Sequence, residues 1–150
     1  AEAALEKVRA LLARYPDDER VPEAMMKVGY YLQVLGQFER AILAYRNAEL
    51  FQDREGKARL HFWLADCLEA HGGLADALAG FLRVSYLYSD QGLWGITSQL
   101  RAGMLYEKRG ENPQARQLYE QIIGSQGAAS DFGRAAQEGL ERLSAANTQD

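Results

Sequence analysis

The sequence has few residues that would cross-link or stiffen it, with one cysteine and three prolines among 150 residues. A single cysteine cannot form an intramolecular disulfide, which excludes a small fold held together by disulfides. Residues branched at Cβ are scarce as well: there are 5 Val, 4 Ile and 2 Thr, against 23 Ala and 20 Leu. Ala and Leu favour helices, whereas β-branched residues favour strands. The composition therefore predicts an all-α protein.

Long apolar runs and basic clusters are also missing. No run of 18 apolar residues occurs, so we expect no segment that inserts directly into a membrane. The 17 basic and 21 acidic residues give a formal net charge of −4, and no block of Lys and Arg could neutralise a row of phosphates. Nucleic acid is therefore not an expected partner. The 47% of hydrophobic residues is typical of a globular chain with a buried core.

What the sequence does contain is a repeat, in which three segments superimpose without gaps over eight positions. The first segment has Val28, Gly29, Leu32, Gly36, Phe38, Ala41, Tyr45 and Ala48. The second has Leu64, Ala65, Leu68, Gly72, Leu74, Ala77, Phe81 and Val84. The third has Ala102, Gly103, Tyr106, Gly110, Asn112, Ala115, Tyr119 and Ile122. The offset is 36 residues between the first two segments and 38 between the last two.

The recurring positions have physical explanations. The second position is always small, which lets one helix approach the backbone of its partner closely. The glycine at the fourth position is expected to end a helix in the left-handed conformation, which costs glycine little. Pro22 and Pro113 suit the first turn of a helix, where a missing N–H is no loss. The pattern predicts helices over residues 2–14, 22–35, 38–51, 55–71, 74–88, 93–109, 113–124 and 130–145.

This pattern resembles the tetratricopeptide repeat, which has a small residue on its first helix and Ala-x-x-x-Phe on its second. The sequence departs from that repeat where Met25, His61 and Gln99 replace the early Trp, and the closing Pro is absent. The resemblance implies a right-handed superhelix of antiparallel helix pairs, with about eight helices in all. It predicts a single domain over residues 1–146 and a tail over 147–150. Within that domain we expect a partial repeat at 1–16, full repeats at 22–53, 58–91 and 96–127, and a capping helix at 130–145.

The predicted helix at 2–14 corresponds to the second helix of a repeat whose first helix is missing. Its apolar side, formed by Leu5, Val8, Leu11 and Leu12, should therefore be left uncovered in a monomer. We expect the chain to self-associate through this N-terminal helix. Because the sequence begins at Ala1 rather than Met, we also expect a processed chain or a segment of a longer one.

The resemblance places the first helix of each repeat along a concave groove. Helical periodicity then puts a set of aromatic, apolar and charged side chains on the groove face, Glu23 among them. The expected partner-binding residues are Met26, Tyr30, Val34, Arg59, Phe62, Asp66, Leu100 and Met104. Trp63 is expected at the edge of the groove beside Arg101. In the alternative interpretation the aromatic and apolar members of this set only cover neighbouring helices, because much of every helix in such a stack is buried.

No arrangement of residues indicates catalysis or metal binding. His61 and His71 are ten residues apart, about 1,000° of rotation on one helix, so their side chains diverge by roughly 80°. Cys67 is expected to be a small buried residue. No known catalytic or phosphate-binding motif is present. We therefore predict that the chain is not an enzyme and needs no cofactor or metal.

The predicted function is a scaffold that binds a helix or extended peptide of another protein in its groove. Tetratricopeptide domains that clamp a C-terminal carboxylate carry Lys and Asn where this chain has Met26 and Tyr30, which argues against that subclass. Two alternatives stay open: an architectural or self-association segment of a larger protein, and an accessory domain of an enzyme. The repeat period and the Arg14 to Asp18 connector resemble bacterial cell-envelope proteins of outer-membrane assembly and of the Tol-Pal system. That resemblance implies a periplasmic location, with the cytoplasm as the alternative.

Overall fold

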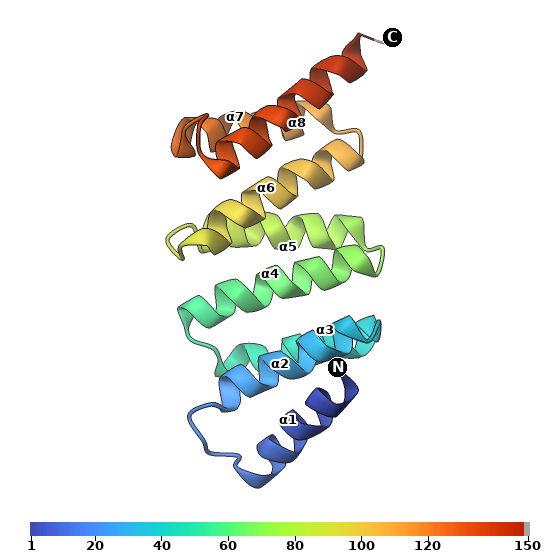
Figure 1. Cartoon of the computed structure of the whole chain (residues 1–150), viewed down its shortest axis with the longest axis vertical. Helices are drawn as coiled ribbons and strands as arrows, with labels where there is room; N and C mark the ends of the chain where they lie inside the picture. The colour runs from blue at the N-terminus through green and yellow to red at the C-terminus, as the bar shows by residue number, and fades with distance from the viewer. Residues whose placement is uncertain (149–150) are drawn as a thin grey trace. The chain divides into compact units, whose positions relative to one another are not determined.

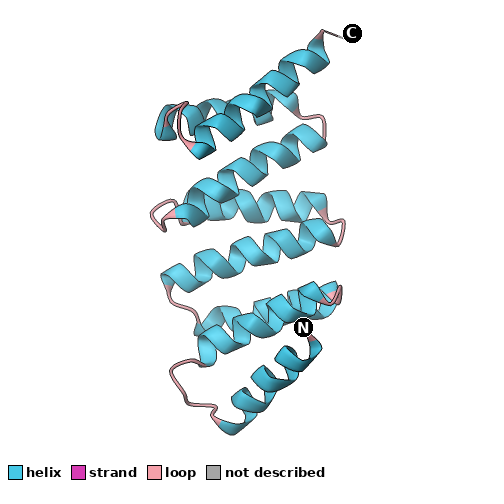
Figure 2. Ribbon diagram, in the orientation of Figure 1, coloured by secondary structure: helices cyan, strands magenta, loops and turns pink. Residues whose placement is uncertain are grey.

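The computed structural model describes residues 1–148, and within that range it contains helices and no strands (Figures 1 and 2). The α-helices are α1 (Glu2–Arg14), α2 (Val21–Val34), α3 (Phe38–Ala48), α4 (Arg54–Ala70), α5 (Leu74–Leu87), α6 (Leu93–Lys108), α7 (Asn112–Gln126) and α8 (Asp131–Asn147). A short 3-10 helix, η1 (Glu49–Phe51), follows α3. The predicted all-α class of antiparallel helix pairs is confirmed. Of the predicted tail, Asn147 ends α8, Thr148 lies in a turn, and the last two residues lie outside the described range.

Seven of the eight predicted helices agree with the structure to within two residues at each end. The exception is the predicted helix at 38–51, which ends as an α-helix at Ala48 and tightens into η1. The side chain of Gln52 explains this change. Its amide Nε2 donates to the carbonyl oxygen of Ala48 at 3.3 Å, while its backbone N–H donates to the carbonyl of Glu49 at 3.2 Å. These two bonds satisfy carbonyls at the end of α3 without a further α-helical turn.

The glycines expected to end the first helix of each pair do adopt the left-handed conformation. Gly36, Gly72 and Gly110 have φ values of +71°, +95° and +75°. An added Cβ at any of them would meet no atom within 4 Å, so backbone conformation and not space explains the glycine. The turn prediction is confirmed at all three positions.

The chain divides into two compact units, Ala1–Gly80 and Phe81–Asp150, each with its own core. In the first unit α1 packs on α2, α2 packs on α3, and α4 packs on both α2 and α3. The buried residues of this core are Leu5, Met26, Leu32, Ala41, Tyr45, Ala48, Leu60 and Cys67. In the second unit, as far as Thr148, α6, α7 and α8 pack on one another. One cluster of buried residues there consists of Ala115, Tyr119, Ile122, Ala136 and Leu143.

The apolar side of α1 is less open than the sequence indicated. Leu5 is buried in the core of the first unit, and Val8, Leu11 and Leu12 are each partly buried. The reason is that α1 packs directly against α2. Self-association through α1 remains a prediction, but the surface available to it is smaller than that of a bare apolar stripe.

The small residues of the repeat do mark close approaches, although at Gly29 and Gly103 the neighbour differs from the one predicted. A Cβ at Gly29 would lie 2.6 Å from ring carbons of Tyr45. In the second unit the ring of Tyr119 lies between two glycines, because a Cβ would lie 2.8 Å from it at Gly103 and 2.5 Å at Gly139. The prediction of a close helix backbone was therefore wrong for Gly29 and Gly103, whereas the predicted small residue Ala65 does lie close to another helix, at Gly80. The two glycines make room for a buried tyrosine ring instead.

A polar network joins the three helices of the second unit. The hydroxyl of Tyr119 on α7 donates to Oε2 of Glu107 on α6 at 2.7 Å. Arg142 on α8 donates to both oxygens of the same carboxylate, at 2.8 and 3.1 Å. The bonds from Arg142 and then from Tyr119 lower the pKa of Glu107 below its usual 4.5. The charged form of Glu107 is therefore stabilised by folding.

This network predicts a loss of stability in acid. Because the pKa of Glu107 is lower in the folded chain, its contribution is complete above its unfolded value near 4.5 and is lost as pH falls through the folded value. We expect Glu107→Gln to lower the free energy of unfolding at pH 7 by about 1 kcal/mol and to weaken its dependence on pH between 5 and 2. Urea denaturation across this range measures both effects. Glu141→Gln, at an exposed carboxylate on α8, is the control. A Glu107→Gln profile parallel to the wild type would contradict the network.

Candidate binding pocket between α2 and α4

In the first unit, α2 and α4 enclose an open pocket of about 230 Å³, here called the α2–α4 pocket. It is lined by Glu23, Met26, Lys27, Tyr30, Tyr31, Arg59 and Trp63. Along α2 the lining residues lie three or four positions apart, and Arg59 and Trp63 lie four apart on α4, so each set occupies one helical face. Three of the eight residues predicted from the sequence, Met26, Tyr30 and Arg59, meet here.

The pocket has aromatic walls over an apolar floor. The rings of Tyr30 and Trp63 meet edge to face, with centroids 4.6 Å apart and planes at 84°. Tyr31 lies beside Tyr30 at a centroid distance of 5.6 Å. Tyr30 is 38% exposed and Met26 only 5% exposed. Met26 is therefore a core residue that forms the floor, while Tyr30 is the aromatic group that an incoming side chain can reach.

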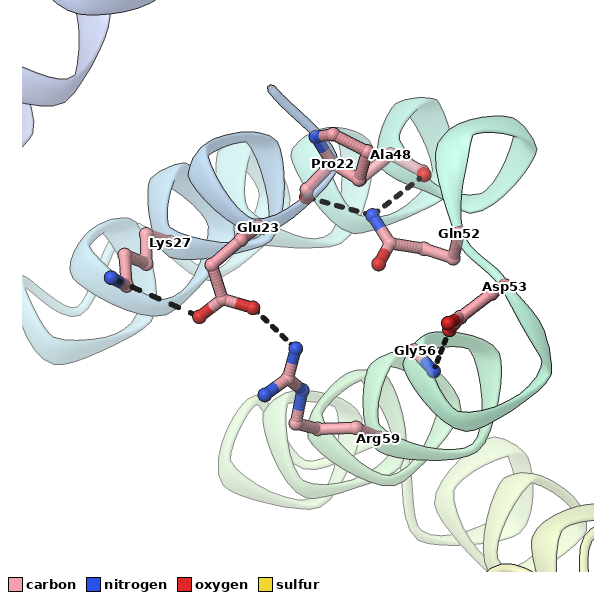
Figure 3. A network of polar contacts seen from close by, with 8 residues as sticks. All are labelled: Pro22, Glu23, Lys27, Ala48, Gln52, Asp53, Gly56 and Arg59. Atoms are coloured by element: carbon pink, nitrogen blue, oxygen red, sulfur yellow. Dashed lines mark hydrogen bonds and ion pairs between the residues drawn. The ribbon is translucent and has the colours of Figure 1, made fainter. Parts of the chain in front are cut away.

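One side of the pocket is charged (Figure 3). Arg59 on α4 bonds Oε2 of Glu23 on α2, and Lys27 places its Nζ 3.8 Å from Oε1 of the same carboxylate. Two cations therefore share one anion. The side chain of Lys27 is 51% exposed and its ion pair is long, so its ammonium remains accessible from solvent.

The segment before α4 fixes this charged side. The buried Gln52 donates from Nε2 to the carbonyl oxygen of Pro22 at 2.8 Å, which ties the start of α4 to the start of α2 (Figure 3). Asp53 caps α4 by accepting from the backbone N–H of Gly56 at 2.8 Å. A Cβ at Gly56 would lie 2.6 Å from Oε1 of Gln52, so a larger residue there would displace the amide. These contacts set the position of Arg59 relative to Glu23.

Two buried donors at the pocket have no hydrogen-bond partner. They are Nε of Arg59 and Nε1 of Trp63, and both are shielded from solvent. Leaving a buried donor unsatisfied costs about 1–3 kcal/mol. Such a cost needs an explanation, and binding of an acceptor at this place would supply one.

The remaining predicted residues lie outside the pocket. Asp66 is engaged within the first unit, where its Oδ2 accepts from Nε2 of Gln33 at 2.7 Å. Phe62 is partly buried on α4, and Val34 is exposed at the end of α2. In the second unit, Leu100 packs against the core and Met104 is exposed on α6.

Sequence reasoning missed two lining residues, Lys27 and Tyr31, and placed Trp63 only at the edge of the groove. The signal for Lys27 was available, since it follows Glu23 by four positions and therefore shares its face. Tyr31 carried the same signal, because it follows Lys27 by four positions.

The titratable side chains of the described residues do not converge on a reactive centre. His61 places Nε2 3.1 Å from Oε1 of Glu49, whereas His71 lies 3.9 Å from Glu39. Cys67 is buried, and burial raises the pKa of its thiol to about 11, so it is protonated at neutral pH. Among residues 1–148, no group of three or more His, Cys, Asp or Glu is arranged to hold a metal ion. In the same range no helix is both long and apolar enough to cross a bilayer.

Residues 97–125, on α6 and α7, match the family model of the tetratricopeptide repeat. They lie within the third repeat expected from the sequence. No curated protein matches the chain significantly. The family match covers one repeat, so the assignment of the remainder depends on the fold.

Solved structures support a tetratricopeptide-like fold for nearly the whole chain. BtubC (BKLC) from P. vanneervenii is 20% identical, with a TM-score of 0.72 over 97% of this chain and 63% of BtubC. This chain therefore spans less than two thirds of that protein. A kinesin light chain assigned in Podosopora anserina, with nearly identical TPR-like repeats, is 18% identical over 89% of this chain and 70% of its own length, at a TM-score of 0.66. MamA is 16% identical over 93% of this chain and 88% of its own, at a TM-score of 0.61.

Proposed function

We propose that this chain is a non-enzymatic scaffold that binds a peptide or helix of a partner protein on the face formed by α2 and α4. A tetratricopeptide-like fold generally mediates interactions between proteins. The single observation that carries the proposal is the α2–α4 pocket, where an exposed tyrosine lies beside a tryptophan over an apolar floor. Aromatic side chains of this kind supply much of the binding energy in protein interfaces.

The size of the pocket favours a protein partner over a free small molecule. Pockets for drug-sized ligands measure about 300–1,000 Å³ and enclose most of the ligand. The α2–α4 pocket measures about 230 Å³ and is open. It suits one or two side chains of a segment that lies along the helices, with the rest of that segment outside. A periplasmic or cell-envelope location, expected from the repeat period and the Arg14 to Asp18 connector, is part of this proposal, with the cytoplasm as the alternative.

The competing function is purely architectural, with the pocket residues serving only to hold helices together. The burial of Met26 fits that function, whereas the exposure of Tyr30 does not. An accessory role beside a catalytic domain of a longer chain is the other candidate. An accessory domain would bind through the same face as a free-standing scaffold. Identifying the protein that binds to this face therefore distinguishes the two functions.

Substitution at the exposed aromatic tests the proposal. Tyr30→Ala should weaken binding of proteins captured by the immobilised chain by about thirtyfold, because removing a central interface aromatic typically costs about 2 kcal/mol. Affinity is measured on each captured protein after purification. Tyr86→Ala, which removes an exposed tyrosine of α5 outside the pocket, is the control and should leave affinity unchanged.

Folding has to be measured on the same variants, because Tyr30 also contacts Trp63. Retained helicity and melting with lost binding would support a recognition surface. A folded Tyr30→Ala protein that binds every captured protein as the wild type does would show that the binding face lies elsewhere. Where Tyr30→Ala is unfolded, Tyr30→Phe and Lys27→Gln replace it, since each alters the pocket with little loss of packing.

A further inference from the structure

We infer that the segment recognised at the α2–α4 pocket carries a carboxylate next to an apolar side chain. The apolar side chain would lie against Tyr30 and Trp63, and the carboxylate would bind Lys27 and Arg59. This inference rests on the proposed function and specifies the chemistry of its partner.

The first observation behind it is the imbalance of charge at the pocket. Of its lining residues, Lys27 and Arg59 are cationic and Glu23 is the one anion. Glu23 is already bonded to Arg59, and its contact with Lys27 is long at 3.8 Å. A second carboxylate placed between the two cations would give each its own partner. Charge-assisted bonds of this type are about twice as strong as bonds between neutral groups.

The second observation is the pair of unsatisfied donors. Nε of Arg59 and Nε1 of Trp63 come from positions four apart on α4, so their side chains lie on the same face one turn apart. An ionised carboxylate only accepts hydrogen bonds and has about four acceptor sites, so it matches two nearby N–H groups. Both donors are shielded from solvent, so a neighbouring side chain must move before a carboxylate can reach them. The ring of Tyr30, which is partly exposed and contacts that of Trp63, is one such neighbour of the indole.

A neighbouring pocket could attract the opposite charge. It measures about 340 Å³, shares Glu23 and Arg59 with the α2–α4 pocket, and adds the acidic Glu19, Asp53 and Glu55. The chain as a whole also carries a net charge of −4. Lys27 does not line that neighbouring pocket, so its ammonium stays available to a negative group even where those carboxylates compete for Arg59. We therefore expect the α2–α4 pocket to select a negative group.

Random peptide libraries test this chemistry without knowledge of the natural partner. Two phage-displayed dodecapeptide libraries are selected on the immobilised chain, one with the random segment internal and the other with it ending in a free carboxyl terminus. We expect the internal library to yield sequences with Asp or Glu within two positions of a large apolar residue. Enrichment confined to the terminal library would place the same chemistry on a C-terminal carboxylate and would overturn the assignment to an acidic side chain.

Variants at Lys27 test whether the preference for acidic peptides arises at the α2–α4 pocket. In the Lys27→Gln protein the acidic preference should disappear while the apolar preference remains. Lys7→Gln, the same charge change on an exposed residue of α1, should alter neither. With a selected peptide, exchanging its acidic residue for the amide should weaken binding to the wild type about tenfold and binding to Lys27→Gln by less than twofold.

The possible outcomes separate this inference from the proposed function. Enrichment of apolar residues with Lys or Arg, or with no charged residue, would overturn the inference and leave the proposed function standing. Enrichment of acidic peptides that Lys27→Gln binds equally well would place the charge recognition elsewhere and would also overturn it. If neither library yields any sequence that depends on Tyr30, the proposed function fails, and the inference fails with it.

Discussion

Replacing Tyr119 by alanine is expected to lower the free energy of unfolding by about 3–5 kcal/mol, the cost of deleting a large aromatic ring from a core. Tyr119 has no solvent exposure and lies between α6 and α8, with glycines at positions 103 and 139 against its ring. Deleting the ring leaves a space between α6 and α8, and these helices could fill it only by shifting as whole bodies. A large cavity should therefore remain. Urea denaturation followed by far-ultraviolet circular dichroism measures the change.

Tyr119→Phe is the matched control for this prediction. It keeps the ring and removes only the hydroxyl that donates to Glu107, so we expect a loss of about 1 kcal/mol. The difference between the two variants then reports the packing of the ring alone. A Tyr119→Ala protein within 1 kcal/mol of the wild type would mean that the ring does not fill the space between α6 and α8.

The helices could be predicted from sequence because their signals are local. The period of small and apolar residues located each helix, and glycines marked turns such as the one at Gly72, which has φ of +95°. The end of α3 was missed because it depends on Gln52 reaching back to Ala48 and across to Pro22. A hydrogen bond to a residue 30 positions away cannot be predicted from local periodicity.

The sequence located the close contacts of the repeat but did not identify the groups that make them. A small residue at Gly29 or Gly103 indicates that space is limited, but it does not say what fills that space. In the structure a tyrosine ring does so in both units. That ring is the aromatic of the second helix in the first and third repeats, so there the small residue and the aromatic form one packing contact.

The lining of the α2–α4 pocket was predicted in part. Helical periodicity placed Met26 and Tyr30 on one face of α2, but how deep each lies depends on where α4 crosses that face. Met26 is 5% exposed as a result, whereas Tyr30 stays accessible. Phe62 and Asp66 lie on the same helix as Arg59 and Trp63 but do not line the pocket, and Asp66 bonds Gln33 instead. These differences depend on the distance between the helices. A single sequence does not contain that distance.

Replacing Gly29 by alanine is the second substitution expected to have a large effect, with a loss of about 1–3 kcal/mol in the free energy of unfolding. The added Cβ would lie 2.6 Å from two ring carbons of Tyr45, closer than nonbonded atoms approach. Tyr45 has no solvent exposure, and its hydroxyl donates to Oε1 of Gln33 at 3.0 Å, so the ring cannot move away freely. Alanine favours a helix over glycine by about 1 kcal/mol, so the steric cost must exceed that gain.

Gly124→Ala makes the comparison decisive, because the same chemical change is expected to have the opposite sign there. Gly124 lies inside α7 in the second unit and is exposed, and an added Cβ would meet nothing within 4 Å. Only the helix propensity remains, so this variant should gain about 0.5–1 kcal/mol. Thermal and urea denaturation of both variants tests the pair. Stabilisation by Gly29→Ala equal to that by Gly124→Ala would mean that α2 does not press against the ring of Tyr45. Destabilisation by both would mean that the loss at Gly29 cannot be assigned to that contact.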